Sequence, residues 1–125
     1  MKVVVKTENA PKAIGPYTQG ILSERFIFVS GQLPINPVTG TFPSENIKEL
    51  TRQSLYNIKA ILEEAGSSMD KIVKTTIFLT NMDDFVDVNS AYAEFFNEAA
   101  PTRSCVEVSR LPKNAVIEIE AIAIQ

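Results

Sequence analysis

The chain has no histidine and one cysteine, so its side chains can support only a few kinds of chemistry. Ser-His-Asp and Cys-His catalysis in their usual forms are excluded, as is any zinc site built with imidazole. Chemistry must come from Arg, Lys, Asp, Glu, Tyr, Ser, Cys and backbone amides. Two pairs have a spacing of two residues: Arg103 with Cys105, and Glu118 with Glu120. Residues two apart in a strand share one face and lie about 6–7 Å apart, so each pair would present two functional groups together.

Each residue type allows more than one role. An arginine guanidinium can grip a carboxylate through two parallel hydrogen bonds, and a glutamate can orient a water molecule and move its proton. Ion pairs within or between chains are the simpler interpretation of Arg103, Glu118 and Glu120. Cys105 can equally be a small buried hydrophobe, and no histidine is present to activate its thiol.

The elements that must position these residues belong to an α+β domain. Helices are predicted over Asn46–Ala65, with Asn46 and Glu49 resembling a capping box and Gly66 after the last turn, and over Asp83–Glu98, with Asp83 as N-cap. Six short strands are predicted at Met1–Lys6, Gly20–Ser23, Phe26–Ser30, Lys71–Thr80, Arg103–Arg110 and Val116–Ile124. Gly31–Ser44 is predicted to be a long surface connection. This order predicts two helices packed on one face of a single mixed sheet.

The last predicted strand is apolar on both sides. Its odd positions, from Ile117 to Ala123, suit the helix layer, whereas the even positions combine Glu118 and Glu120 with two isoleucines. Two helices can cover only one face of the sheet. We therefore expect the second face to pack against other copies of the chain.

Size and composition favour an ordinary globular protein. The 125 residues fit one domain, 1–125, that needs no disulfide or metal. The net charge of -3 argues against a general nucleic-acid-binding surface. No apolar run approaches the ~20 residues that span a bilayer, and nothing at the N-terminus resembles a signal peptide, so we expect a cytoplasmic protein.

Three separated blocks carry a family pattern. They are AIGPYTQG at 13–20, FVSGQLPINPVTG at 28–40 and APTRSCVEVSRLPKNAVIEIEAIAIQ at 100–125. The last block contains Pro-x-Arg-Ser-x-hydrophobic and then hydrophobic-Glu-Ile, filled by Pro101, Arg103, Ser104, Val106, Ile117, Glu118 and Ile119. In these blocks the chain resembles the reactive intermediate deaminase (RidA) family, and the similarity extends over essentially its whole length.

The resemblance implies a chorismate-mutase-like fold and a homotrimer with clefts between subunits. It implies hydrolysis of small enamines and imines of 2-ketoacids, such as 2-aminoacrylate and 2-aminocrotonate, to 2-ketoacids and ammonia, with no cofactor and no metal. The same fold also serves a second hypothesis, a ketoacid-binding regulatory trimer with little catalysis. A third, a translation-inhibiting ribonuclease, is disfavoured by the acidic balance and the absence of histidine.

The resemblance also implies roles for individual residues. Arg103 matches the carboxylate-binding arginine and Glu118 the acidic position that orients the attacking water, both expected on the second, shared face of the sheet. Cys105 is implied to bind substrate through its backbone N–H, without a covalent step. The remaining implied substrate-binding residues are Tyr17, Ser30 and Gly31, for which core packing and a strand-ending turn are the simpler alternatives.

Overall fold

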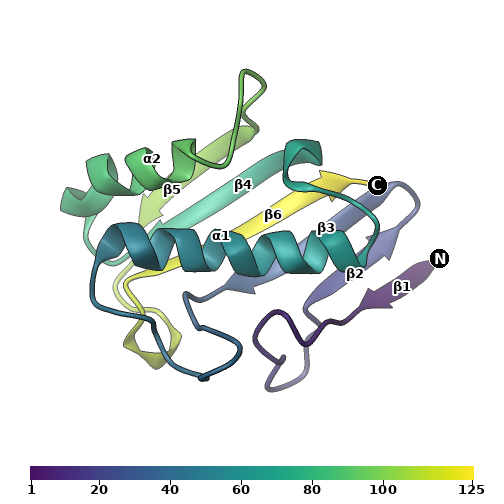
Figure 1. Ribbon diagram of the computed structural model, residues 1–125, viewed down its shortest axis with the longest axis horizontal. Helices are drawn as coiled ribbons and strands as arrows, with labels where there is room; N and C mark the ends of the chain where they lie inside the picture. The colour runs from purple at the N-terminus through teal and green to yellow at the C-terminus, as the bar shows by residue number, and fades with distance from the viewer.

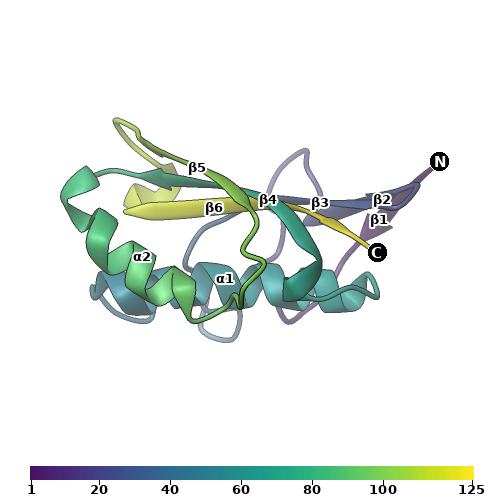
Figure 2. The same ribbon diagram turned by 90° about the horizontal axis from the view of Figure 1, so that it is seen from above.

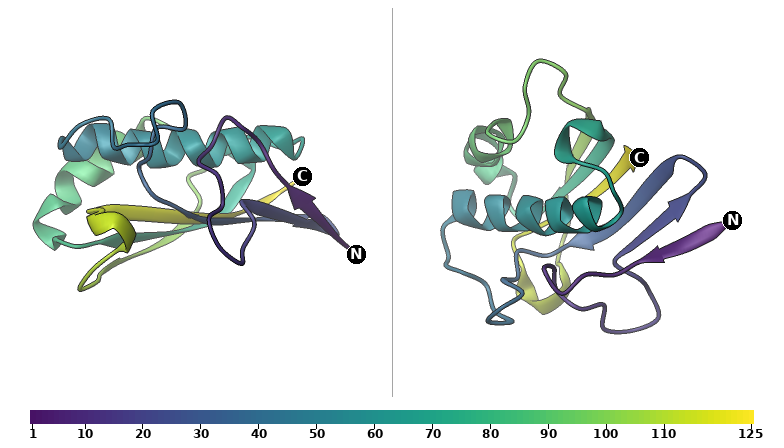
Figure 3. Two further views of the ribbon diagram at one scale, coloured as in Figure 1. Left: turned by 90° about the horizontal axis from the view of Figure 1, so that it is seen from below. Right: turned by 45° about the vertical axis from the view of Figure 1, so that its right-hand side comes forward.

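Two helices lie on one face of a six-stranded sheet, and no helix covers the other face (Figure 2). The computed structural model describes residues 1–125. The helices are α1 (Ile47–Glu64) and α2 (Phe85–Ala93). The strands are β1 (Lys2–Val5), β2 (Gly20–Ser23), β3 (Phe26–Gln32), β4 (Ile72–Leu79), β5 (Thr102–Glu107) and β6 (Ile117–Ile124). Both helices appear on the same side when the sheet is viewed from below, which confirms the predicted α+β arrangement (Figure 3).

The strand order in the sheet is β1-β2-β3-β6-β4-β5 (Figure 1). The pair β4–β5 is parallel and joined through α2, whereas every other pair is antiparallel, so the sheet is mixed as predicted. The last strand of the sequence, β6, therefore lies in the middle of the sheet. This places Glu118 between β3 and β4 rather than at an edge.

Alternation along β6 fixes which side chains meet the helices. Ile117, Ile119, Ala121 and Ala123 are buried, as the pattern predicted. Four residues of α1 pack above them without any exposed surface: Leu55, Ile58, Ile61 and Leu62. Full burial of such side chains contributes about 1.5–3 kcal/mol each, so this layer is the main source of stability.

The opposite side of the sheet carries an apolar patch. Phe26, Phe28 and Val106 are 46%, 45% and 41% exposed. Ile124 pairs with Phe26 and Ile122 with Phe28 across the β3–β6 ladder, and both isoleucines are half-buried. We call these five residues the open face. Exposed apolar surface of this kind is typical of an interaction site.

Helix α1 begins and ends where the sequence predicted. The Asn46 side chain accepts hydrogen bonds from the backbone N–H groups of Lys48 and Glu49, and Gly66 adopts a φ of 80° after the last turn. Glycine suits this left-handed position because it has no Cβ. The reciprocal half of the capping box is absent, because the Glu49 carboxylate accepts a hydrogen bond from the Ser44 hydroxyl instead.

Helix α2 is shorter than predicted at both ends. It begins at Phe85, after a short 3-10 turn in which Asn81, and not Asp83, supplies the capping side chain. At the other end the backbone tightens into i→i+3 hydrogen bonds, such as Phe95 N–H to the Tyr92 carbonyl. Phe95 and Phe96 then pack on two different rings, Tyr56 at 5.1 Å and Tyr92 at 4.7 Å between centroids. A continued helix would not direct both phenylalanines to these partners.

Two strand ends also differ from the prediction. Strand β3 continues to Gln32, so Gly31 belongs to the sheet and the long loop starts two residues later. Strand β5 ends at Glu107 instead of Arg110, because its parallel partner β4 ends at Leu79. Neither helix has the length and apolar character required to cross a membrane.

Candidate functional site

Four of the predicted site residues line one cavity of about 470 Å³: Tyr17, Ser30, Gly31 and Glu118. Its wall comes from the loop before β2, the end of β3 and the loop that follows, the turn at Pro112, and β6. These segments are far apart in the sequence. The antiparallel pairing of β3 with β6 brings them together, because it sets the end of β3 beside the start of β6.

Glu118 lies against the bare backbone of Gly31. A Cβ atom on Gly31 would be 2.8 Å from the Glu118 Cδ atom and 2.9 Å from its Oε2 atom. Only glycine therefore leaves room for the carboxyl group in this position. The close approach places the Glu118 carboxyl at the wall of the cavity.

The Glu118 carboxyl makes no ion pair and accepts no hydrogen bond within the chain. Burial raises its pKa above the ordinary glutamate value, and the nearby charge of Glu120 raises it further. Desolvation and a like charge both disfavour the ionised form. Glu118 can therefore hold a proton at a higher pH than an exposed glutamate and release it to a ligand in the cavity.

Tyr17 and Ser30, which also line the cavity, are held by hydrogen bonds within the chain. The Tyr17 hydroxyl accepts a hydrogen bond from the Ile14 N–H at 3.3 Å, and the ring is 52% exposed. The Ser30 hydroxyl donates to the Thr18 carbonyl at 2.5 Å. Since that proton is already used, the Ser30 oxygen is left to act as an acceptor.

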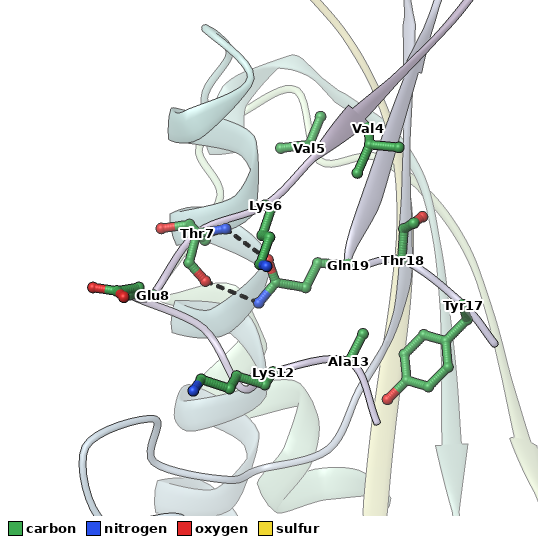
Figure 4. Close-up of a pocket in the computed structure, with 10 residues that line it drawn as sticks. All are labelled: Val4, Val5, Lys6, Thr7, Glu8, Lys12, Ala13, Tyr17, Thr18 and Gln19. Atoms are coloured by element: carbon green, nitrogen blue, oxygen red, sulfur yellow. Dashed lines mark hydrogen bonds between the residues drawn. The ribbon is translucent and has the colours of Figure 1, made fainter. Parts of the chain in front are cut away.

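A buried glutamine holds the loop that carries Tyr17. The Gln19 side chain accepts from the Thr7 N–H at 2.7 Å and donates to the Thr7 carbonyl at 3.0 Å (Figure 4). It also donates to the carbonyls of Ala10 and Pro11. This single side chain connects the irregular segment to the start of β2, and the Tyr17 ring extends back toward Ala13 (Figure 4).

Arg103 lies elsewhere, between β5 and α2. Thr75 of β4 pairs with Arg103 on one side and with Ala121 on the other, and buried Ala121 faces the helices. Arg103 therefore faces the helices too. The expectation that it shares the second face of the sheet with Glu118 is wrong within one chain, because the register puts the two side chains on opposite faces.

Helix α2 surrounds the Arg103 guanidinium. Its NH1 group donates to the Asn89 Oδ1 atom at 2.7 Å, and its central carbon lies 5.0 Å from the Tyr92 ring centre and 5.5 Å from that of Phe85. The cleft in front of it is lined by Asn89, Tyr92 and Pro101 among others. No carboxylate of the chain is within ion-pair distance of Arg103.

Cys105 lies on the same side of β5 as Arg103, packed against the core. Burial raises the pKa of its thiol, and the opposing effect of the Arg103 charge is smaller. A raised pKa leaves little thiolate at neutral pH, so the side chain is a poor nucleophile. No cluster of three His, Cys, Asp or Glu side chains that could hold a metal ion occurs.

Asn89 was missed by the sequence analysis. The available signal was its spacing, since Phe85, Asn89 and Tyr92 are four and three residues apart and so share one helix face. A polar residue within an otherwise apolar face indicates a polar partner, here Arg103. Lys12 and Lys113, which also line the cavity beside Glu118, were missed because neither lies in a recognisable pattern.

The chain has close relatives of known family. Residues 7–125 match the family model described as endoribonuclease L-PSP. A RutC family protein from Pyrococcus horikoshii is 56% identical over 98% of both chains. The 2-iminobutanoate/2-iminopropanoate deaminase of Escherichia coli K12 is 52% identical over 100% of this chain and 99% of its own.

A solved structure, E. coli TdcF with bound serine, superimposes with a TM-score of 0.94 at 46% identity, covering 98% of both chains. The overall fold is therefore shared with this structure. The chain belongs to the endoribonuclease L-PSP family, which is the RidA family indicated by its three sequence blocks.

Proposed function

We propose that this protein hydrolyses 2-iminobutanoate, 2-iminopropanoate and their enamine tautomers to 2-ketoacids and ammonia, without a cofactor. The full-length relative that carries this activity in its name is 52% identical. The observation that carries the proposal is the state of Glu118: a half-buried carboxyl with a raised pKa, unpaired, and held against Gly31 in the wall of a cavity. Such a group is suited to proton transfer with a ligand in the cavity.

The chemistry requires only water and a proton carrier. Protonated Glu118 gives its proton to the imine nitrogen, which makes the adjacent carbon electrophilic. The resulting carboxylate accepts a proton from a water molecule as the water oxygen bonds to that carbon. Glu118 returns this proton to the nitrogen. Ammonia then leaves as the hydroxyl gives its proton back to Glu118 and the C=O bond forms, so that Glu118 ends protonated as it began. The sum is imine plus water giving ketoacid plus ammonia.

The substrate carboxylate needs a separate anchor, and Arg103 fits that role. Its guanidinium has free N–H donors and no carboxylate partner in the chain. Since Arg103 and Glu118 point to opposite faces of one sheet, a single chain does not bring both to one ligand. We therefore propose a homotrimer of the chorismate-mutase-like type, in which the Arg103 side of one chain completes the Glu118 cavity of its neighbour.

The open face supplies a driving force for this assembly. Phe26, Phe28 and Ile122 present apolar surface that a second chain would remove from water. Phe28→Asp should therefore convert the trimer to monomers in sedimentation experiments, without unfolding the chain. A Phe28→Asp protein that sediments as wild type would contradict the open face as the interface.

Mixing two inactive variants tests the composite site directly. Subunits carrying Arg103→Ala and subunits carrying Glu118→Gln each lack one half of every cleft. After unfolding and refolding together in equal amounts, about one quarter of the clefts should draw both intact residues from different subunits. Recovery of about that share of wild-type activity is expected; no recovery would show that both residues must come from one chain.

The reaction itself is tested with a pyridoxal-phosphate-dependent threonine dehydratase, which releases the enamine. Added protein should speed the loss of the enamine and the appearance of 2-oxobutanoate. Arg103→Ala and Glu118→Gln should abolish the acceleration. If Arg103→Ala protein accelerates the reaction as wild type does, the site assignment is wrong, and if the wild type gives no acceleration the function is wrong.

RNA is not the substrate that we propose, although the family description contains the word endoribonuclease. The net charge is -3, whereas RNA-binding surfaces normally carry a basic excess. RNA cleavage that co-purifies with the protein and disappears in Glu118→Ala would support the ribonuclease instead.

A further inference from the structure

We propose that Tyr92, locked by Thr75, is a positioning residue that holds the Arg103 guanidinium in its carboxylate-binding orientation. This inference rests on the proposed function, because it assigns to Arg103 the carboxylate of the substrate. It concerns three side chains from three elements: α2, β4 and β5.

The first observation is that one face of α2 supplies the hydrogen bond and both cation–π contacts of the guanidinium. Phe85, Asn89 and Tyr92 follow one another at helical spacing, and all three contact Arg103. Asn89 accepts a single hydrogen bond, whereas the two rings lie over the guanidinium at cation–π distances. We call these three residues the α2 cradle.

The second observation is that the α2 cradle carries no negative charge. A half-buried arginine is ordinarily paired with a carboxylate, because burying an unpaired charge is costly. Here the partners are a neutral amide and two ring faces, which attract the cation without neutralising it. A carboxylate ligand can therefore bind the guanidinium without first breaking an ion pair within the chain.

The third observation is the hydrogen bond that fixes the cradle to the sheet. Thr75 Oγ1 and the Tyr92 hydroxyl are 2.7 Å apart, and both residues are buried. Thr75 is the strand neighbour of Arg103, so the ring of Tyr92 spans two adjacent side chains of the sheet. With its hydroxyl held by Thr75, the ring cannot swing away from the guanidinium without breaking this bond.

The consequence is a guanidinium held in one orientation before the ligand arrives. Pre-organisation of this kind improves affinity, because fewer rotamers are lost on binding. Loss of the Thr75–Tyr92 bond should weaken binding of a carboxylate ligand and leave a neutral ligand of the same shape unaffected. A merely structural role for Tyr92 would alter both ligands alike.

The experiment measures the Kd of 2-oxobutanoate and of its neutral analogue 2-oxobutanamide, by calorimetry on the intact protein. Tyr92→Phe keeps the ring and removes the hydroxyl. Its Kd for 2-oxobutanoate should rise about fivefold, the size expected from losing one neutral hydrogen bond, with no change for the amide. Thr75→Val should give the same shift, and Thr75→Ser should restore the wild-type value.

Tyr56→Phe is the matched control. Tyr56 lies on α1 with 52% of its surface exposed, and its hydroxyl makes no hydrogen bond in the chain, so both ligands should bind as to the wild type. Tyr92→Phe combined with Thr75→Val should weaken binding no more than either change alone, because both remove the same bond. If Tyr92→Phe does not fold, the Kd values of Thr75→Val and Thr75→Ser for the two ligands provide the same test.

The outcomes separate this inference from the proposed function. If the wild type does not distinguish 2-oxobutanoate from 2-oxobutanamide, Arg103 does not bind the carboxylate, and both its anchor role and its positioning by Tyr92 are wrong, whereas the hydrolysis is still judged by the dehydratase assay. If the wild type distinguishes them and Tyr92→Phe and Thr75→Val do so equally well, only the positioning role is overturned. If these variants bind both ligands more weakly by the same factor, the positioning role of Tyr92 is also overturned.

Discussion

Replacement of Gly31 by alanine should reduce activity strongly while leaving the fold nearly as stable as before. The new Cβ atom would be 2.8 Å from the Glu118 Cδ atom and 3.1 Å from its Cγ atom. Carbon atoms in contact are about 3.5–4.0 Å apart, so the carboxyl group must retreat by about 1 Å. A displacement of this size in a catalytic group can lower the rate by about 100-fold. The end of a glutamate side chain moves easily, so the stability cost should stay below about 1 kcal/mol.

Gly20→Ala is the matched control, because it crowds the core in place of the cavity. Its Cβ atom would be 2.9 Å from the Ile61 Cγ2 atom and 3.3 Å from the Phe28 carbonyl oxygen. Ile61 is fully buried and cannot move aside. We expect a loss of about 1–3 kcal/mol, which lowers the melting temperature by about 4 °C per kcal/mol, and little change in kcat.

The two variants are compared by thermal unfolding and by steady-state kinetics with enzymatically generated 2-iminobutanoate. Gly31→Ala should keep the wild-type melting temperature but have a much lower kcat. Gly20→Ala should have a lower melting temperature but nearly the wild-type kcat. Wild-type kinetics in Gly31→Ala would refute the idea that the Glu118 carboxyl must occupy the space above Gly31.

Two further predictions concern stability. Burial raises the pKa of Glu118 in the folded state. Its contribution to the free energy of unfolding is therefore complete below the ordinary glutamate pKa of about 4.3, where the carboxyl is protonated in both states. The contribution is lost as the pH rises through the folded-state pKa. Glu118→Gln should therefore unfold at higher denaturant concentration than the wild type at about pH 8, and the gain should shrink towards about pH 4; a constant gain would contradict this. The buried Asn57 amide donates to the Leu33 and Ile35 carbonyls at 3.1 and 2.9 Å. Asn57→Leu should therefore lower the free energy of unfolding by about 2–3 kcal/mol. Amide hydrogen exchange should also become faster in the cavity loop after β3. Unchanged exchange there would show that the loop does not depend on Asn57.

The sequence was sufficient for the elements of the fold but less so for their ends. All six strands and both helices were predicted from hydrophobic periodicity, and the faces of β6 followed from alternation. The ends of α2 were wrong, because they depend on tertiary contacts of Phe95 and Phe96. Hydrophobic periodicity predicts how far an apolar helix face extends along the sequence. It does not predict the residue at which the backbone stops being helical.

The relation between Arg103 and Glu118 was not accessible from the sequence for a different reason. Alternation divides each strand into two faces but does not say which face of one strand matches which face of the next. That match depends on register, and only the pairing of Thr75 with both Arg103 and Ala121 reveals it. The grouping of Tyr17, Ser30, Gly31 and Glu118 needed no such information, because the shared sequence blocks already joined them.

The central position of β6 has a consequence for biosynthesis. Until Ile117–Ile124 has left the ribosome, β1-β2-β3 and β4-β5 are two separate sheets with unpaired facing edges, and neither half can close alone. Unpaired edges of this kind are prone to aggregation, so the nascent chain passes through a vulnerable state that ends only with its last strand. Since β6 also carries Glu118, the step that completes the sheet is the same step that delivers the reactive carboxyl. A folding intermediate of this protein is therefore not expected to be catalytically competent.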